Sequence, residues 1–149
     1  MKSTVAFVGI KCAKYMGVVA SVFTLACLQQ NVALAEGKFT STCENITLEG
    51  AGLEAVCKTT DQRNSNTGIN LNGYITNRNG VLRWRRNGEF MNSSQNCDVE
   101  WHSGVSILHC DCLRRDGTWT GSTLNLDERI ANINGALTYE RPPAGLVFP

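Results

Sequence analysis

The sequence predicts an all-β domain built from two copies of one unit, and three observations support this prediction. Residues 69–84, INLNGYITNRNGVLRW, recur as residues 124–139, LNLDERIANINGALTY, at a spacing of 55. Apolar residues alternate with polar ones, as in the series Leu53, Ala55 and Cys57, which is the period of a half-buried strand. No segment after residue 35 keeps a helical period for three turns.

An Asn-Gly pair lies in the middle of each copy, at residues 79–80 and 134–135. Both residue types tolerate the positive φ angles that tight primed turns require, so these pairs are strong hairpin signals. We therefore expect one β-hairpin in each copy. Helix is expected only as single turns before the hairpins, at residues 71–75 and 126–130.

Each half is too small to be stable alone. About 50 residues bury too little apolar surface, so the halves are expected to share one core and fold as one unit. This gives a single domain over residues 36–141, with repeats at about 37–88 and 90–141 and a short tail at 142–149.

The N-terminal region has the pattern of a secretory signal peptide. Three lysines in the first 14 residues precede an uncharged stretch at 16–28, and a small-x-small pattern at 33–35 precedes Glu36. We expect cleavage near Ala35-Glu36 and a secreted or periplasmic product. A membrane anchor and lipid attachment at Cys27 are the alternatives, but the apolar stretch is shorter than the roughly 20 residues that span a bilayer.

Removal of residues 1–35 changes the sign of the net charge. Three of the fourteen Lys and Arg leave and none of the thirteen Asp and Glu, so eleven basic and thirteen acidic residues remain, a net charge of −2. This charge does not favour nucleic acid or an anionic membrane as a partner of the mature form. The basic residues Arg83, Arg85 and Arg86 are interpreted as a solvated turn flank.

Five cysteines remain after cleavage, and in an exported chain they indicate disulfides. Overlaying the halves puts Cys97 on Cys43 at a spacing of 54, and Cys112 on Cys57 at 55. The simplest pairing is therefore Cys43–Cys57 with Cys97–Cys112, which leaves Cys110 as a buried free thiol. A Cys97–Cys110 bridge is the open alternative.

The chain offers little catalytic or metal-binding chemistry. Its two histidines, His102 and His109, stand in no catalytic spacing, and HCDC at residues 109–112 lacks the paired ligands of structural zinc sites. Asp127 and Glu128 look like a solvated turn. The glycines form no phosphate-binding loop. Neither an enzyme nor a metal or other cofactor is expected.

Four stretches in order, together with the two cysteine spacings, resemble the cyanovirin-N homology family from residue 37 to residue 140. The stretches are GKFTSTC, LEAVCK, INLNGYITNRNGVLRW and LNLDERIANINGALTYE. The resemblance implies a pseudo-twofold fold in which two intertwined repeats exchange strands. It also implies a lectin that binds terminal α1,2-linked mannose of high-mannose oligosaccharides or glycoproteins at two sites.

By this resemblance the first site combines the N-terminal segment, the residues after the first disulfide and the second hairpin. Lys58 stands where the family prototype has an acid, and Asn134 where it has an aspartate. The implied residues are Lys38, Ser41, Thr42, Lys58, Thr60, Asn132 and Asn134.

The implied second site combines the first hairpin, two arginines and the linker before Cys97. Its implied residues are Thr76, Asn77, Asn79, Arg114 and Arg115. Thr76 replaces an acid of the prototype, and Leu113 replaces a lysine. Turn chemistry accounts for Asn79 and Asn134 but not for the repeated Asn77 and Asn132, which makes that pair the first candidates for function.

The linker between the halves affects the expected oligomeric state. In the family it is the hinge about which halves exchange between two chains, and residues 85–96, RRNGEFMNSSQN, are four residues longer than the prototype's linker and contain glycine. A longer linker relaxes the strain that favours exchange. We expect mainly a monomer, with a domain-swapped dimer as the alternative.

Overall fold

The computed structural model describes residues 38–141. The chain divides into two units, Met1–Val32 and Ala33–Pro149, and all described residues belong to the second. The predicted signal peptide, its cleavage site and the tail at 142–149 lie outside the described residues. Within 38–141, no helix has the length and apolar character needed to cross a membrane.

The described residues form short strands and single 3-10 turns, as predicted. The strands are β1 (Cys43–Glu49), β2 (Gly52–Lys58), β3 (Asn64–Asn70), β4 (Ile75–Asn77), β5 (Leu82–Trp84), β6 (Ser94–His102), β7 (Val105–Leu113), β8 (Trp119–Asn125), β9 (Ile130–Ile133) and β10 (Ala136–Tyr139). The 3-10 turns are η1 (Phe39–Ser41), η2 (Leu71–Gly73), η3 (Phe90–Ser93) and η4 (Leu126–Glu128).

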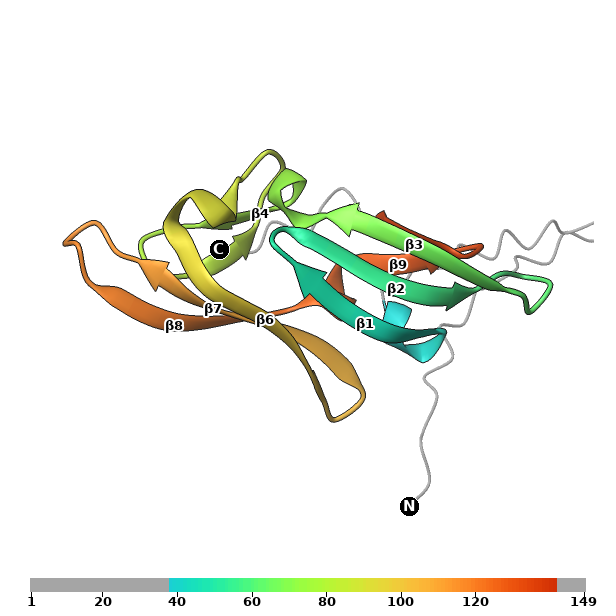
Figure 1. Ribbon diagram of the computed structural model, residues 1–149. Coiled ribbons are helices and arrows are strands. Elements are labelled where there is room, and N and C mark those ends of the chain that lie inside the picture. Colours follow the sequence, from blue (N-terminus) through green and yellow to red (C-terminus); the bar gives the residue numbers. More distant parts are fainter. Residues whose placement is uncertain (1–37, 142–149) are drawn as a thin grey trace, which may run out of the picture. The chain divides into compact units, whose positions relative to one another are not determined.

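The two halves exchange their hairpins. Strands β1–β2–β3 and β6–β7–β8 form antiparallel sheets, and β4–β5 and β9–β10 form hairpins. Leu137 N in β10 donates to Thr67 Oγ1 in β3 (3.0 Å), and Leu82 N in β5 donates to Ser122 Oγ in β8 (2.9 Å). Each hairpin thus packs on the sheet of the other half, and Figure 1 shows β9 beside β2 and β3. The predicted pseudo-twofold, intertwined fold is confirmed.

The shared apolar positions of the repeated stretch form the centre of the core. Leu71 and Leu126 begin equivalent 3-10 turns after asparagine caps, and both side chains are fully buried. Because these positions come from both halves, the core depends on both. Other buried members of the same core cluster are Phe39, Leu53, Ile75, Leu82, Phe90, Leu108, Ile130 and Leu137.

One predicted disulfide is confirmed and the other is wrong. Cys43 and Cys57 are bonded as expected, whereas Cys97 is bonded to Cys110, and Cys112 is the free cysteine. The strand register explains the difference. In the β6–β7 ladder Gln95 opposes Asp111 and Asp98 opposes His109, so Cys97 faces Cys110 after the bulge between these pairs.

The wrong pairing arose from the spacing used to overlay the first strands of the halves. The residue opposite Cys112 is Ser94, just as Cys43 is opposite Cys57. Ser94 is therefore the counterpart of Cys43, at a spacing of 51. The difference from 55 lies in the β6–β7 hairpin, whose strands have nine residues each where β1 and β2 have seven.

The free thiol of Cys112 is buried against Ser94. The Ser94 Oγ to Cys112 Sγ distance is 3.3 Å, and no part of Cys112 is exposed. Burial raises the pKa of the Cys112 thiol, the hydrogen bond to Ser94 lowers it in part, and the charge of Asp111 raises it again. Since the ordinary pKa of a thiol already lies above neutrality, Cys112 stays protonated at neutral pH.

The S94C variant is expected to form a third disulfide, with Cys112, in the position that Cys43–Cys57 occupies in the other half. Ser94 lies directly opposite Cys112 with its Oγ 3.3 Å from Cys112 Sγ, so the two side chains face each other, and the added cross-link restricts the unfolded chain. We expect the free energy of unfolding to rise by about 2 kcal/mol. Intact mass and denaturant unfolding measure this, and S94C/C112S is the control; an S94C protein that retains a free thiol in its folded state contradicts the prediction.

The linker is shorter than the sequence indicated. Turn η3 mirrors η1, with Phe90 in the place of Phe39, so the segment from Phe90 onward belongs to the second half. Residues 85–89 alone connect β5 to this half. The four extra residues of the second half lie in the β6–β7 hairpin and not in the linker. The prediction that a longer linker relaxes strain is therefore wrong, because the linker does not contain the added residues.

The G88A variant is expected to destabilise the closed chain. A Cβ at Gly88 would overlap the Ile75 carbonyl and lie 2.7 Å from Thr76 N, and backbone atoms have little room to move. We expect a loss of about 2 kcal/mol in the free energy of unfolding and a larger dimer fraction, because opening the linker removes the overlap. Denaturant unfolding and light scattering measure these quantities, with G73A as the control, where an added Cβ meets no atom within 4 Å. Equal effects of the two variants contradict the prediction.

Candidate functional site

The two hairpin turns have the backbone that their sequence predicts. Asn79 and Gly80 have φ angles of 56° and 87°, and Asn134 and Gly135 have 51° and 84°. Positive φ at both central residues is the signature of a type I′ turn. The turn at Gly80 is also closely packed, since a Cβ there would lie 2.7 Å from Arg114 Cγ. Each turn is thus fixed in shape and in position.

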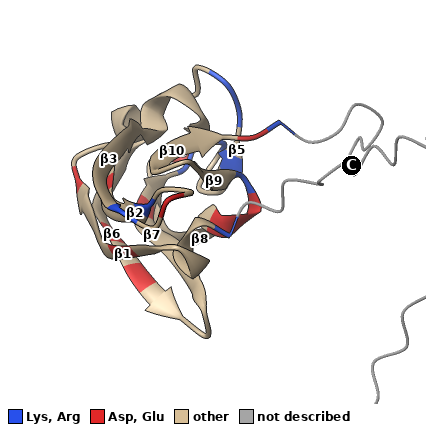
Figure 2. Ribbon diagram, turned by 90° about the vertical axis from the view of Figure 1, so that its right-hand side faces the viewer, with Lys and Arg blue, Asp and Glu red and all other residues tan. Residues whose placement is uncertain are grey.

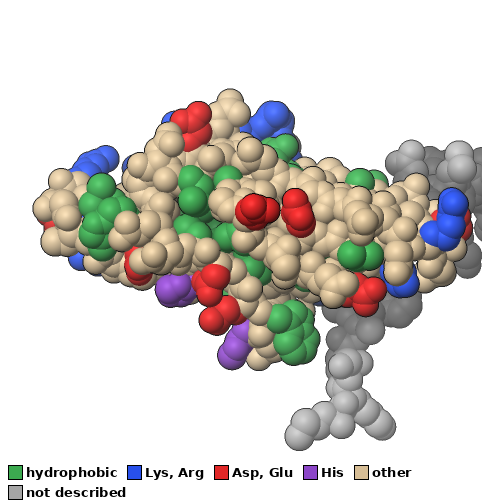
Figure 3. Space-filling view, in the orientation of Figure 1, with side chains coloured by type: hydrophobic (Ala, Val, Ile, Leu, Met, Phe, Trp, Pro, Cys, Tyr) green, Lys and Arg blue, Asp and Glu red, His purple; other side chains and the backbone are tan. Residues whose placement is uncertain are grey.

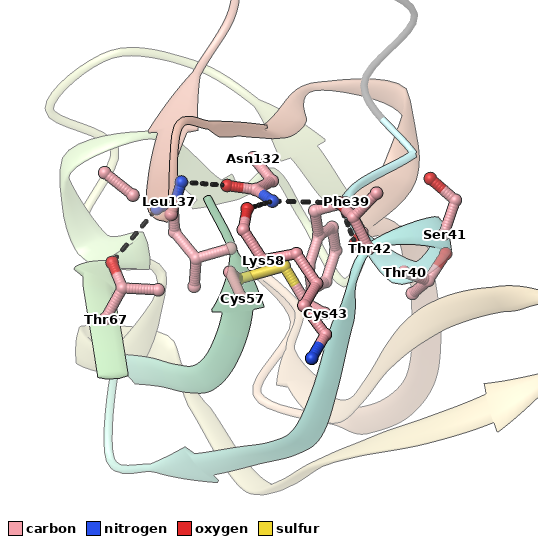
Figure 4. The surroundings of a disulfide bond; sticks show 12 residues. Phe39, Thr40, Ser41, Thr42, Cys43, Cys57, Lys58, Thr67, Asn132 and Leu137 are labelled. Carbon is pink, nitrogen blue, oxygen red and sulfur yellow. Dashed lines mark hydrogen bonds between the residues drawn. A yellow bond between two sulfur atoms is a disulfide. The ribbon is translucent and has the colours of Figure 1, made fainter. Parts of the chain in front are cut away.

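Asn132 joins the second hairpin to the first half. Its Nδ2 donates to Thr42 Oγ1 (2.9 Å) and to Lys58 O (2.7 Å), and its Oδ1 accepts from Gly135 N (2.7 Å). Figure 4 shows these contacts above the Cys43–Cys57 disulfide. Both amide protons and the carbonyl oxygen are engaged within the protein, so the side chain positions the hairpin.

Asn77 performs the same task for the first hairpin. Its Nδ2 donates to Leu113 O (2.9 Å) and to the carbonyl and hydroxyl oxygens of Ser93 (2.8 and 3.0 Å), and its Oδ1 accepts from Gly80 N (2.8 Å). The repetition of Asn77 and Asn132 is therefore explained by docking between the halves. A role of this pair in ligand binding stays a prediction.

The turn asparagines have a free amide group. Asn134 Oδ1 accepts from Thr60 N and Thr60 Oγ1, both at 3.0 Å, and Asn79 Oδ1 accepts from Arg115 N at 2.9 Å. Both asparagines are exposed, and their Nδ2 groups have no hydrogen-bond partner among residues 38–141. Asn79 and Asn134, rather than Asn77 and Asn132, present unengaged donors to solvent.

The structure brings the predicted first-site residues together around the second hairpin. Lys38 forms a bridge to Ala131 in β9, and Thr42 O accepts from Lys58 N (2.8 Å). Ser41 Oγ is exposed and donates to Lys38 O (2.8 Å). The Lys58 ammonium donates to Asn64 Oδ1. Hydroxyl and amide groups from three segments that are distant in sequence thus meet at one end of the molecule.

All five predicted second-site residues line one hollow of about 550 Å³. Ser93, from the implied linker, and Leu113, from a position that the resemblance also implied, line the same hollow, and the backbone carbonyls of both accept from Asn77 Nδ2. Arg78 is the lining residue that the resemblance did not imply. Overlaying the halves at 51 instead of 54 identifies Ser93 as the counterpart of Thr42. The lining consists of Thr76, Asn77, Arg78, Asn79, Arg85, Ser93, Leu113, Arg114 and Arg115.

Asp127 is a structural residue that the sequence reading placed in solvent. It is 5% exposed, and its carboxylate accepts from Thr40 N (3.1 Å), Thr40 Oγ1 (2.8 Å) and Ser106 N (2.7 Å). It therefore holds η1, which precedes Thr42 of the first site. Its counterpart Asn72 accepts from Met91 N (3.1 Å) and holds η3 in the same way.

The described part of the chain contains no group of three His, Cys, Asp or Glu side chains placed to hold a metal ion. The groups assembled at both hairpins are amides and hydroxyls, with the Lys58 ammonium at the first site and guanidinium groups at the second. Such groups donate and accept hydrogen bonds, and this arrangement is typical of a site for a polar, hydroxyl-rich ligand.

Comparison with known proteins agrees with this description. The CVNH domain model matches residues 39–138. The solved structure of the CVNH protein of Gibberella zeae is 28% identical, with a TM-score of 0.63 over 69% of this chain and 97% of that one. Microvirin, solved as a mannobiose complex, is 27% identical, with a TM-score of 0.61 over 68% and 97%.

A third structure, a MoCVNH3 variant solved in complex with (N-GlcNAc)4, is 25% identical, with a TM-score of 0.63 over 69% of this chain and 97% of that one. The family model covers two thirds of the chain, and the three solved structures match it at TM-scores of 0.61 to 0.63. The chain belongs to the CVNH domain family and has the fold of its lectins.

Proposed function

We propose that this protein is a secreted, non-catalytic lectin for mannose-rich glycans, with terminal α1,2-linked mannose as its ligand. The observation that carries the proposal is the presence of an unengaged turn amide, at Asn134 and Asn79, beside hydroxyl or backbone groups of the opposite half. The mannobiose complex of microvirin and the (N-GlcNAc)4 complex of the MoCVNH3 variant support a sugar as the ligand class.

The chemistry of the first site suits a sugar. A hexose hydroxyl donates and accepts at once, and so needs both kinds of partner within reach. Asn134 Nδ2 is a donor, the Ser41 hydroxyl is an exposed donor and acceptor, and Lys58 Nζ adds a charged donor where the family prototype has an acid. Lys58 therefore makes this site richer in donors than the prototype's.

Two shallow sites favour clustered glycans over single sugars. Each site offers a few hydrogen bonds and little apolar burial, so single-site affinity is expected to be weak, and two sites on one molecule give avidity. We further propose that the exported chain is mainly monomeric, because Gly88 packs closely on β4 and stabilises the closed linker.

The proposal is tested on the product of an exporting host that expresses the full chain. N-terminal sequencing tests cleavage after Ala35. A titration of the ¹⁵N-labelled product with α1,2-mannobiose is expected to shift the amides of Thr60, Asn132 and Asn134. A spectrum without shifts at either hairpin rejects the lectin, and supports instead a CVNH-fold interaction module that has lost sugar binding.

A further inference from the structure

Five arginines surround the first hairpin. Arg78, Arg85, Arg114 and Arg115 line the 550 Å³ hollow of the second site. A neighbouring hollow of about 440 Å³ is lined by Asn79 together with Arg78, Arg83 and Arg115. We refer to these five residues as the arginine cluster. They are five of the eleven basic residues that follow residue 35, although this part of the chain carries a net charge of −2.

The charges of the arginine cluster are largely uncompensated. In residues 38–141, the guanidinium groups of Arg78, Arg83, Arg85 and Arg115 make no ion pair or hydrogen bond. Arg114 donates only to the neutral Thr120 Oγ1 (3.3 Å). No Asp or Glu lines either hollow.

Asp116, the nearest acid in sequence to Arg114, makes its hydrogen bonds to another residue. Asp116 Oδ1 accepts from Thr118 N (3.0 Å) and Thr118 Oγ1 (2.7 Å) within the β7–β8 turn. In Figure 3, Lys and Arg side chains lie at the left-hand end of the molecule, where Figure 1 places this turn. The hydrogen bonds from Thr118 are the main cause of the lowered pKa of Asp116, and the charge of Arg114 also contributes to it. This one carboxylate offsets part of the charge of Arg114, so the five arginines still concentrate positive charge at the second site.

The pseudo-twofold relation provides an internal comparison. The spacing of 55 relates each cluster position to a residue at the other end, and none of those residues is basic. In Figure 2 the strands labelled β9 and β10 are tan, whereas the strand labelled β5 carries a blue segment. The residues that correspond to Arg78, Arg83, Arg85, Arg114 and Arg115 are Ile133, Thr138, Glu140, Thr59 and Thr60.

Docking of the hairpin does not require the arginines. At the other end Thr60 performs the contact that Arg115 performs here, since both residues donate a backbone N–H to a turn asparagine. Five clustered positive charges repel one another and oppose folding unless an anion lies among them. Guanidinium forks bind the oxygens of sulfate, phosphate or carboxylate in pairs, with charge-assisted hydrogen bonds.

We propose that the second site binds a glycan that carries an anionic group, while the first site binds a neutral one. The arginine cluster holds the sulfate, phosphate or carboxylate oxygens, and Asn79 Nδ2 donates to a neighbouring sugar hydroxyl. This inference rests on the proposed lectin function and gives its second site a substrate class. The two ends of the protein then differ in specificity.

The first experiment titrates the ¹⁵N-labelled exported protein with mannose, mannose 6-phosphate, mannose 6-sulfate and glucuronic acid. At least one anionic sugar is expected to bind at the amides of residues 77–80 and 114–115 at least about tenfold more tightly than mannose does. This preference is expected to shrink as salt is raised from about 20 to about 300 mM, because ions screen charges at a solvent-exposed site. The three anionic sugars distinguish phosphate ester, sulfate ester and carboxylate.

The second experiment removes two charges while keeping the side-chain stems. In R78Q/R115Q the affinity for the preferred anionic sugar is expected to fall about tenfold or more, and the shifts that mannose causes at Asn134 are expected to stay. The control R63Q/R141Q removes the same charge from exposed positions outside the cluster and is expected to keep the anionic affinity.

Three results overturn the inference: equal affinity of the second site for mannose and all anionic sugars, equal effects of the two double variants, and tighter binding of a single-stranded oligonucleotide than of any sugar. If inorganic phosphate binds as tightly as mannose 6-phosphate, the sugar contributes nothing to affinity, and the second site is a simple anion site and not a glycan site. If mannose shifts the first site in these cases, the proposed lectin function survives. If no sugar shifts either hairpin, both proposals fail.

Discussion

The N132A variant is expected to lose sugar binding at the first site by at least about tenfold and to lower the free energy of unfolding by about 2 kcal/mol. The substitution removes three hydrogen bonds, which join the second hairpin to Thr42 and Lys58 and brace its turn at Gly135. Because each bond contributes about 0.5–1.5 kcal/mol and the side chain is half-buried, the lower part of the summed range applies.

The N77A variant is the matched control. Its side chain makes the corresponding contacts to Ser93, Leu113 and Gly80 at the other end, so a similar loss of stability is expected. Sugar titration followed residue by residue separates the two variants. N132A is expected to lose sugar binding at the first site and keep it at the second, whereas N77A is expected to lose it at the second site and keep it at the first. A uniform loss at both sites in either variant shows global unfolding and contradicts independent docking of the hairpins.

The D127A variant is expected to lower the free energy of unfolding by about 3 kcal/mol, the largest effect of any single polar substitution considered. Ser106 N and Thr40 N lose their acceptor, and Thr40 Oγ1 keeps only the Gly104 carbonyl at 3.2 Å. A charged acceptor contributes about 1.5–3 kcal/mol per bond, and a buried N–H left without a partner adds its desolvation cost. Denaturant unfolding measures the change.

The D127N variant copies the residue that the other half uses at this position. Asn72 accepts a hydrogen bond from Met91 N with its one amide oxygen. An amide at position 127 is therefore expected to keep the hydrogen bond from Thr40 and to lose the one from Ser106 N. The free energy of unfolding is expected to fall by about 1–2 kcal/mol, less than in D127A. A D127A protein as stable as D127N contradicts a role for the side-chain acceptor. Amide hydrogen exchange at η1 is expected to speed up in D127A, since this segment loses its tie to η4.

Much of the fold follows from the sequence, because its signals are local. The Asn-Gly pairs require primed turns, alternation around Leu53 assigns the buried face of β2, and the repeated leucines and isoleucines mark a core shared by two halves. The order of elements and the disulfide between Cys43 and Cys57 follow from the same patterns. The membership of each hairpin in the opposite half came from family resemblance, since local patterns do not specify which sheet a hairpin joins.

Pairing across strands was decided by the tertiary structure alone. Two added residues in each of β6 and β7 changed the spacing between the halves from 55 to 51, so that Ser94 lies opposite Cys112 and Cys97 is bonded to Cys110. The β-bulge occurs in both halves and does not cause this change. Sequence overlay at one fixed spacing cannot detect a length change inside a hairpin when the flanking motifs remain aligned. A shift of one residue in register reverses the face of every side chain, so such errors change pairings completely.

The sequence by itself determined which residue types stand at the two hairpins, and the tertiary structure decided what each of them does. Asn77 and Asn132 dock the hairpins, whereas Asn79 and Asn134 present free amides, although all four are the same residue in one repeated pattern. Arginines separated by up to 37 positions meet around one hairpin, and Asp127 is buried by a segment 87 residues away. The physical reason is that hydrogen-bond partners and neighbouring charges are set by distance in space, which in an exchanged fold is unrelated to distance along the chain.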